Sequence, residues 1–144
     1  IEDLKKEIKE KGLEKNIKIY SSMAKQEDVE KILLKCSLAI APYNPNDKNS
    51  FSFYADPGKV KVYLGCGLPI VITKVPEIYK TIVKEKAGVT ANYGAKDFAD
   101  KITDILGNIE EYRGNARKLG LGYSWDSIFT NAFGSMKKKI NEKI

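Results

Sequence analysis

Histidine is absent from this sequence of 144 residues, and cysteine occurs only twice, as Cys36 and Cys66. Without imidazole there is no Ser-His-Asp or Cys-His catalytic arrangement and no zinc site that requires histidine. Two thiols are also too few for a disulfide framework or a four-cysteine metal site. Two isolated cysteines in apolar surroundings are typical of a reduced protein. We therefore expect a cytoplasmic location and no metal site.

Long hydrophobic runs are also absent. The longest stretch without a charged residue, 62–73, is interrupted by two glycines and a proline. A membrane-spanning helix needs about 20 consecutive apolar residues, so the sequence predicts none. No apolar segment follows Ile1, and this excludes a signal peptide at that point. Ile1 in place of an initiating Met indicates a processed chain or an excised piece.

The residues that are present fit a soluble globular protein, with 42% hydrophobic and 31% charged residues. The length predicts a single domain, 1–144, which ends in a helix over 125–143. The net charge of +6 is compatible with nucleic acid or an anionic membrane surface. Because the lysines are spread along the chain and no nucleic-acid motif accompanies them, we expect no nucleic-acid partner. The tight cluster at 137–139 leaves two alternatives for the last helix, a peripheral membrane contact or a solvated face.

Strand and helix patterns alternate along the chain. Strands are expected at 17–20, 38–41, 69–73 and 88–91, and helices at 1–11, 29–36, 56–67, 76–83, 98–107, 109–119 and 125–143. This alternation predicts a three-layer α/β/α, Rossmann-like parallel sheet. Ligands bind such sheets beyond the carboxyl ends of the strands. The polar stretch 42–55 is predicted to be a long loop at that edge.

The helix expected after this loop has a distinctive start. Asp56 is a preferred N-cap residue, and Pro57 is favoured in the first helical position. The first amides of a helix lack internal partners and carry partial positive charge, so they attract phosphate. Gly58 allows an anion to approach the backbone, and Lys59 adds a formal charge. A capped helix with a solvated lysine explains the same residues, so both interpretations remain open here.

The stretch 57–73, which contains Cys-Gly-Leu-Pro-Ile-Val at 66–71, resembles the retaining glycosyltransferases of group 1. Their usual run is Pro-x-Lys, a small-residue helix end, Cys-Gly-x-Pro-Val-Val and Thr. Further segments agree with the family in order, namely 17–22, 37–42, Gly88 and 123–125. The resemblance covers nearly the whole chain. It implies the donor-binding, C-terminal half of a two-domain enzyme with the B fold of glycosyltransferases.

This resemblance also implies an activity. Such enzymes move a hexosyl group from a nucleoside-diphosphate sugar to a glycan or lipid-linked acceptor with retention, and use neither a metal nor another cofactor. The donor-binding residues that the resemblance implies are Met23, Pro42, Tyr43, Asp56, Gly58, Lys59 and Val62. Met23 would pack on the base, and Asp56 would shape the helix start that holds the diphosphate. No catalytic residue is assigned.

Three departures from the family pattern bear on activity. Two glutamates eight positions apart in the family correspond here to Tyr54 and Val62, and valine cannot accept a hydrogen bond from ribose. The first two strands of the half-domain, with their Arg and Lys, and the N-terminal acceptor domain have no counterpart in these residues. We therefore expect an incomplete sheet and an inactive fragment.

Two alternatives follow from these departures. A non-catalytic nucleotide-binding or assembly module on the same fold would form a dimer through its open sheet edge. A flavodoxin-like receiver domain is disfavoured, because no acidic cluster stands at a strand end.

Overall fold

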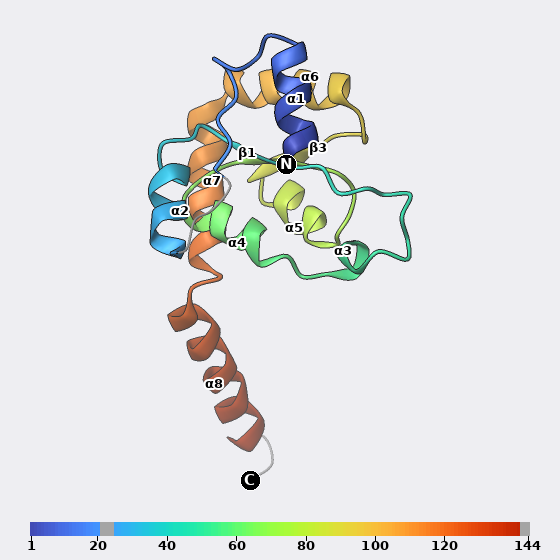
Figure 1. The fold of residues 1–144 in the computed structure, drawn as a ribbon. Helices are drawn as coiled ribbons and strands as arrows, with labels where there is room; N and C mark the ends of the chain where they lie inside the picture. The colour runs from blue at the N-terminus through green and yellow to red at the C-terminus, as the bar shows by residue number, and fades with distance from the viewer. Residues whose placement is uncertain (21–24, 142–144) are drawn as a thin grey trace. The chain divides into compact units, whose positions relative to one another are not determined.

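The computed structural model describes residues 1–20 and 25–141, with side chains as far as Lys137 (Figure 1). The chain divides into two compact units, Ile1–Lys31 and Ile32–Ile144. Each unit has more contacts within itself than with the other unit. This division does not test the expectation of one domain over 1–144, which stays a prediction. Each unit is described by itself below.

The first unit contains helix α1, Glu2–Glu10, and most of helix α2, Gln26–Leu33. Ion pairs three or four residues apart line the exposed side of α1, between Glu2 and Lys5, Lys6 and Glu10, and Glu7 and Lys11. The helix stops before Gly12, whose φ of +64° is the left-handed conformation that glycine adopts readily at helix ends. The predicted stop at Gly12 is therefore confirmed.

The strand predicted at 17–20 is wrong. A strand is held by hydrogen bonds to a neighbour, and no other strand in the described part of the chain pairs with this segment. Ile17 and Tyr20 remain 42% and 48% exposed, so the alternating pattern faces no core here. The Lys18 ammonium lies over the Tyr20 ring instead, 4.8 Å from its centroid.

The second unit is built on a parallel sheet of three strands in the order β1-β2-β3. The strands are β1 (Ala39–Ala41), β2 (Ile70–Ile72) and β3 (Gly88–Thr90). Their register aligns Ile40 with Val71 and Val71 with Val89. The predicted α/β architecture with a parallel sheet is thus confirmed, with three strands where the sequence pattern suggested four.

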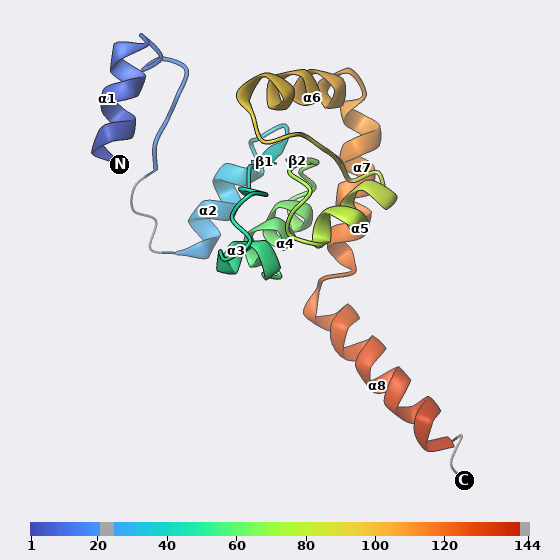
Figure 2. The same ribbon diagram turned by 90° about the vertical axis from the view of Figure 1, so that its right-hand side faces the viewer.

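Helices cover both faces of this sheet (Figure 2). The helices that follow α2 are α3 (Phe51–Tyr54), α4 (Gly58–Gly65), α5 (Ile78–Lys84), α6 (Ala95–Gly107), α7 (Ile109–Leu121) and α8 (Trp125–Asn141), and those that pack on the sheet include α4, α5 and α6. Helix α3 interrupts the stretch 42–55 that the sequence predicted as a loop throughout. Its start is capped by Ser50, whose hydroxyl accepts from the Ser52 amide at 3.2 Å.

Alternate residues of the strands belong to two separate hydrophobic clusters, one on each face of the sheet. One face of the sheet presents Ile70 and Ile72 to Val60 and Leu64 of α4, together with side chains from α5 and α7. The opposite face presents Val71 to residues of α6, Phe98 and Ile105. Because β2 is buried on both faces, its sequence is continuously apolar. The two clusters fix the strand ends that carry the candidate site.

Candidate functional site

The carboxyl ends of β1 and β2 are tied together by one side chain. Thr73 follows β2 and is buried, with 1% of its surface exposed. Its hydroxyl donates to the carbonyl of Tyr43, which follows β1, across 2.7 Å, and the Val75 carbonyl lies 3.2 Å away as a second acceptor. This bond holds the loop after β1 against the start of the loop after β2, at the sheet edge where parallel sheets bind ligands.

Helix α4 begins at this edge. Its first residue is Gly58, and its N-cap is Pro57, not Asp56 as the sequence predicted. Asp56 lies one residue too early to cap the helix, and its carboxylate accepts a hydrogen bond from the Lys61 ammonium instead. No side chain caps α4. Lys61 therefore pairs with the carboxylate that the sequence predicted would accept a hydrogen bond from a backbone amide of α4.

The first amides of α4 are open to ligand. The Val60 amide donates to the Pro57 carbonyl at 3.0 Å, while no bond is seen for the amides of Gly58 and Lys59 within the described residues. Gly58 is exposed, and a Cβ added there would meet no atom within 4 Å. Unpartnered amides at a helix start carry partial positive charge, so this end of α4 suits an anion.

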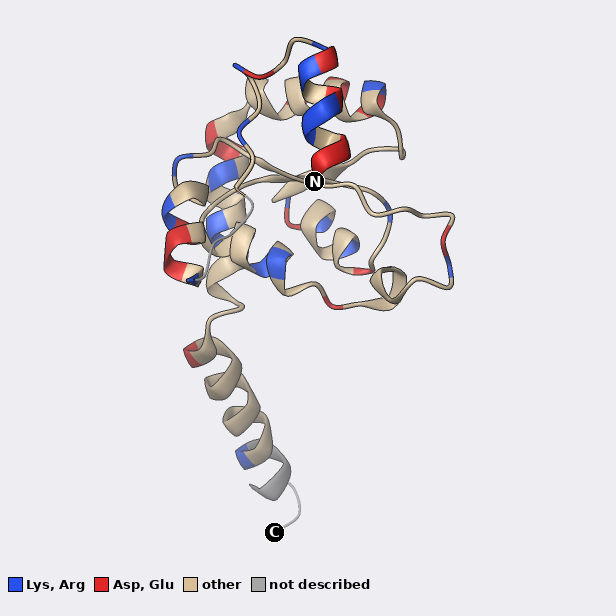
Figure 3. Cartoon of the chain, in the orientation of Figure 1, with Lys and Arg blue, Asp and Glu red and all other residues tan. Residues whose placement is uncertain are grey.

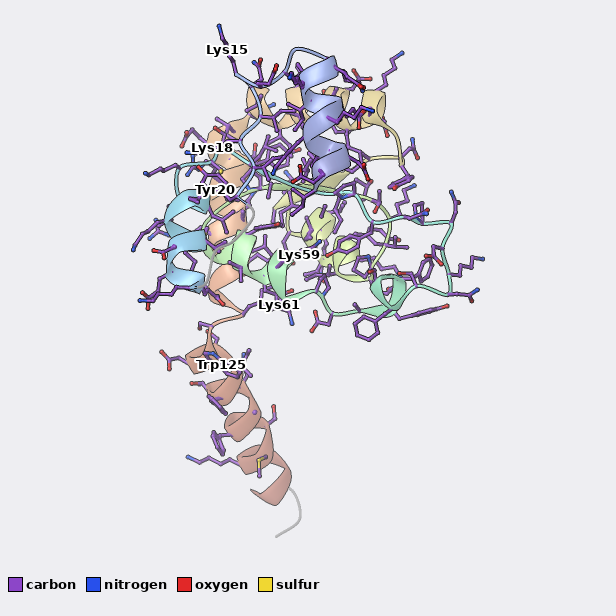
Figure 4. All side chains as sticks on the ribbon, viewed as in Figure 1. Lys15, Lys18, Tyr20, Lys59, Lys61 and Trp125 are labelled. Atoms are coloured by element: carbon purple, nitrogen blue, oxygen red, sulfur yellow. The ribbon has the colours of Figure 1, made fainter. Side chains whose placement is uncertain are left out.

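Lys59 and Tyr43 complete this corner. The Lys59 ammonium lies 4.7 Å from the centroid of the Tyr43 ring, a cation–π contact between α4 and the loop after β1. Figure 4 shows Lys59 and Lys61 projecting from the start of α4, and Figure 3 shows the positive charge there. We call Tyr43, Gly58 and Lys59 the α4 corner. It brings a formal charge and free amides to one place.

Tyr43 is held in its neutral form. Burial raises the pKa of its hydroxyl above the usual value, and the neighbouring Tyr63 raises the pKa further. The hydroxyl oxygen is buried and has no hydrogen-bond partner in the part of the chain that the structure describes. The neutral ring therefore offers Lys59 its π face without neutralising the charge of the ammonium.

Pro42 and Val62, two other predicted donor residues, are not part of this corner. Pro42 lines a separate apolar hollow of about 380 Å³ next to Ile40 and Phe98. Val62 is half-buried farther along α4, and its side chain has no acceptor for a ribose hydroxyl. Met23 lies outside the described residues. Of the seven predicted residues, the structure thus brings three together in the α4 corner.

A second hollow beside the corner was missed by sequence reasoning. It measures about 480 Å³ and is lined by residues of both charges, including Asp56, Lys61, Glu77 and Lys80, with Tyr123. The Lys61 ammonium lies 5.3 Å from the centroid of the Tyr123 ring. Two sequence signals touch this hollow: Asp56, which was predicted as a helix cap, and the segment 123–125, which served only as a point of resemblance to the family.

Two kinds of feature are absent from the described residues. No group of three or more His, Cys, Asp and Glu side chains that could hold a metal ion occurs within residues 1–20 and 25–141. Within these ranges, none of the helices combines the length and the hydrophobicity that a membrane span requires.

A family model described as glycosyl transferases group 1 matches residues 2–108. The chain belongs to this family. Members of the family use nucleotide-sugar donors, so an anion-binding corner at a sheet edge is the expected kind of site. The matched range contains all three strands and the whole of α4, and α7 and α8 lie beyond it. No curated protein and no solved structure matches the chain.

Proposed function

We propose that this glycosyltransferase domain holds the diphosphate of a nucleoside-diphosphate sugar at the α4 corner. In this proposal it is the donor-binding part of a cytoplasmic enzyme that transfers a hexosyl group, with retention and without a metal, to a glycan or lipid-linked acceptor held by another domain. The observation that carries the proposal is the uncapped start of α4, with Gly58 exposed and Lys59 beside it.

The chemistry of sugar transfer suits this corner. When the glycosidic bond to the donor breaks, negative charge builds on the leaving diphosphate. Fixed amide dipoles and a nearby ammonium stabilise that charge without reorganising. Asp56 does not oppose them, because Lys61 pairs with its carboxylate. The corner is therefore net positive at the point where the anion would lie.

The ribose would contribute less to affinity than the phosphates. Val62, at the position where the family resemblance places a ribose-binding carboxylate, offers an apolar side chain only. We infer that uridine and guanosine diphosphates bind with similar affinity, because the shared diphosphate supplies most of the interaction.

Calorimetry with uridine and guanosine diphosphates tests the proposal. Lys59→Ala should weaken binding of both nucleotides about five- to tenfold, as expected for loss of a charge-assisted contact. Lys84→Ala, at a lysine exposed on the far end of α5, is the matched control and should bind as the parent does. A chelator should leave binding unchanged. If Lys59→Ala binds as tightly as the parent, the phosphate assignment is wrong.

A second candidate is a non-catalytic assembly module, and two observations favour it. Val62 lacks an acceptor for ribose, and in the described part of the chain only the β2 side of β1 is paired. An open edge of a sheet favours pairing with another chain. Sedimentation velocity separates the two candidates, because a dimer that ignores nucleotide supports the assembly module and a monomer that binds diphosphate supports the donor site.

A further inference from the structure

Arg113 and Arg117 are the only two arginines in the sequence, among 25 lysine and arginine residues. They lie four residues apart in α7, so their side chains share one face of that helix. Figures 1 and 2 show α7 beside α4, and both arginines line a third hollow, of about 280 Å³, at the end of α4. We call it the arginine hollow. It gathers every guanidinium of the chain in one place.

Neither arginine is explained by a partner within the protein. In the described part of the chain, no ion pair and no hydrogen bond is seen for either guanidinium. Glu111, the acid closest to Arg113 in sequence, pairs instead with Lys86, 3.6 Å away. Arg113 is nevertheless half-buried, and a guanidinium carries five N–H donors that require acceptors. These donors are available to a ligand.

The end of α4 does not need the arginines either. Cationic side chains near a helix end often bind its last carbonyls, which otherwise lack partners. Here the Leu68 amide donates to the Tyr63 carbonyl across 2.9 Å. The Gly67 amide donates to the Leu64 carbonyl, also across 2.9 Å. These two bonds are the Schellman arrangement, which closes a helix with backbone groups alone. The arginines are therefore left for another role.

Two neighbouring guanidinia form a suitable site for a phosphate group. Each guanidinium presents parallel N–H donors that match two oxygens of a phosphate or a carboxylate. A carboxylate has two oxygens and is satisfied by one arginine, whereas the terminal oxygens of a phosphate can accept from both. We propose that Arg113 and Arg117 bind a phosphate group in the arginine hollow. Glu110 lines the same hollow and repels an anion there, which limits the affinity.

This site is separate from the α4 corner. Gly58 and Lys59 of the corner are the first residues of α4, whereas the hollow lies past its last residue, Gly65. A helix of this length extends about 12 Å. Arg113 and Arg117 also lie beyond residues 2–108, which the family model matches. A phosphate in the arginine hollow is therefore additional to the diphosphate of the donor.

Proton–nitrogen NMR spectra of the isotope-labelled, 144-residue chain test this proposal. Since the sequence has two arginines, the side-chain Nε–H region contains two signals, and both come from the site. Inorganic phosphate at neutral pH should shift both signals to saturation with one shared dissociation constant, and acetate should shift them far less. Signals that do not move, that move without saturating, or that respond equally to acetate overturn the proposal.

Glycerol phosphate distinguishes the source of the phosphate group. If it binds at least as tightly as inorganic phosphate, the hollow accepts a phosphate ester. If it binds more weakly, the hollow selects the free ion. Both outcomes support a phosphate site, and a glycerol phosphate that binds while inorganic phosphate does not would overturn it, because the contacts would then come from the glycerol.

Matched variants assign the binding to the arginines. Arg113→Lys keeps the charge and loses the planar fork, so it should weaken phosphate binding about fivefold, measured from the Arg117 signal. Glu110→Gln should tighten binding about threefold, because it removes the like charge. Lys118→Gln, at an exposed lysine next to Arg117, is the control and should bind as the parent does. If Lys118→Gln weakens binding as much as Arg113→Lys, general positive charge explains it and the proposal is wrong.

The same spectra keep this site apart from the proposed donor site. Lys59→Ala should leave the phosphate titration of the arginine signals unchanged, since Lys59 lies at the other end of α4. Arg113→Lys should leave the affinity for uridine diphosphate unchanged. Failure of either site therefore leaves the measurement of the other intact.

Discussion

At the scale of single residues, two glycines of α7 differ sharply in what surrounds them. A Cβ added to Gly120 would lie 2.4 Å from the carbonyl oxygen of Leu64 in α4, whereas one added to Gly114 would meet nothing within 4 Å. Backbone atoms cannot move aside as a flexible side chain can. Gly120 therefore sets how closely α7 approaches α4, the helix that carries two residues of the α4 corner.

This difference predicts opposite effects of the same substitution. Gly120→Ala should lower the free energy of unfolding by about 1–3 kcal/mol, because overpacking forces the two helices apart. Gly114→Ala should raise it by about 0.5–1 kcal/mol, because alanine loses less entropy in a helix. Urea denaturation of both variants measures the effects. A neutral Gly120→Ala would contradict the close approach of α7 to α4, and a destabilised Gly114→Ala would contradict the open surroundings of Gly114.

Tyr43 gives a prediction for alkaline pH. Its pKa is raised on folding, mainly by burial, from a usual value of 10.0. A raised pKa stabilises the fold below pH 10 and loses that contribution as pH rises through the folded-state pKa. The free energy of unfolding should therefore decline above pH 10, less steeply in Tyr43→Phe than in the parent.

The same substitution has an effect at neutral pH. Because the buried Tyr43 hydroxyl finds no partner among the described residues, Tyr43→Phe should raise the free energy of unfolding by about 1 kcal/mol. Tyr54→Phe, at a ring that is 75% exposed, is the control for both measurements. Identical pH profiles for the parent and Tyr43→Phe would show that the hydroxyl is hydrated in solution.

At the scale of elements, the sequence predicted β1, β2, β3 and α4 because their signals are local. The continuous apolar run at 69–73 has the composition of a strand buried on both faces. Gly67 follows the end of α4 and has a φ of +71°, a conformation that glycine adopts readily at helix ends. The prediction of a strand at 17–20 failed because a strand also needs a neighbouring strand to bond with, and a local sequence pattern does not show whether one is present. The prediction that Asp56 caps α4 failed for a similar reason, because the Lys61 ammonium pairs with its carboxylate instead.

The candidate site was predictable in its position but not in its details. Capping preferences located the start of α4 within one or two residues, and Gly58 and Lys59 lie there. The contact between Lys59 and the Tyr43 ring joins residues from two elements, as does the bond from Thr73 to Tyr43. Such pairings depend on strand register and helix placement. The spacing of residues in a single sequence does not predict them.

Replacing isoleucine by alanine should lower the free energy of unfolding by different amounts in two neighbouring strands of the sheet. Ile72 of β2 is fully buried, and Ile40 of β1 is 49% exposed. Ile72→Ala should lower the free energy of unfolding by about 2–5 kcal/mol, because it leaves a cavity in a closed cluster. Ile40→Ala should cost less than about 1 kcal/mol, since solvent already reaches that side chain. Thermal denaturation compares the two, and equal costs would show that β1 is covered in solution.

At the scale of the whole molecule, the α4 corner and both hydrophobic clusters belong to one unit. The three strands, the clusters and the residues Tyr43, Gly58 and Lys59 all lie within Ile32–Ile144. The one helix that crosses the boundary of the units is α2, whose Leu33 packs on the larger cluster. The second unit, extended to include α2, therefore contains every residue of the α4 corner, whereas Met23, predicted to pack on the base, precedes it.

A shortened chain of residues 25–144 tests this division. Since it retains α2 and both clusters, we expect one cooperative thermal transition and an affinity for uridine diphosphate within about threefold of the parent chain, a change below 1 kcal/mol. The ratio of affinities between the shortened chain and its Lys59→Ala variant should match the ratio in the parent. Loss of the cooperative transition would show that residues 1–24 belong to the same folding unit. A preserved transition with diphosphate binding lost would place essential donor contacts in the removed segment, and the α4 corner would then be insufficient by itself.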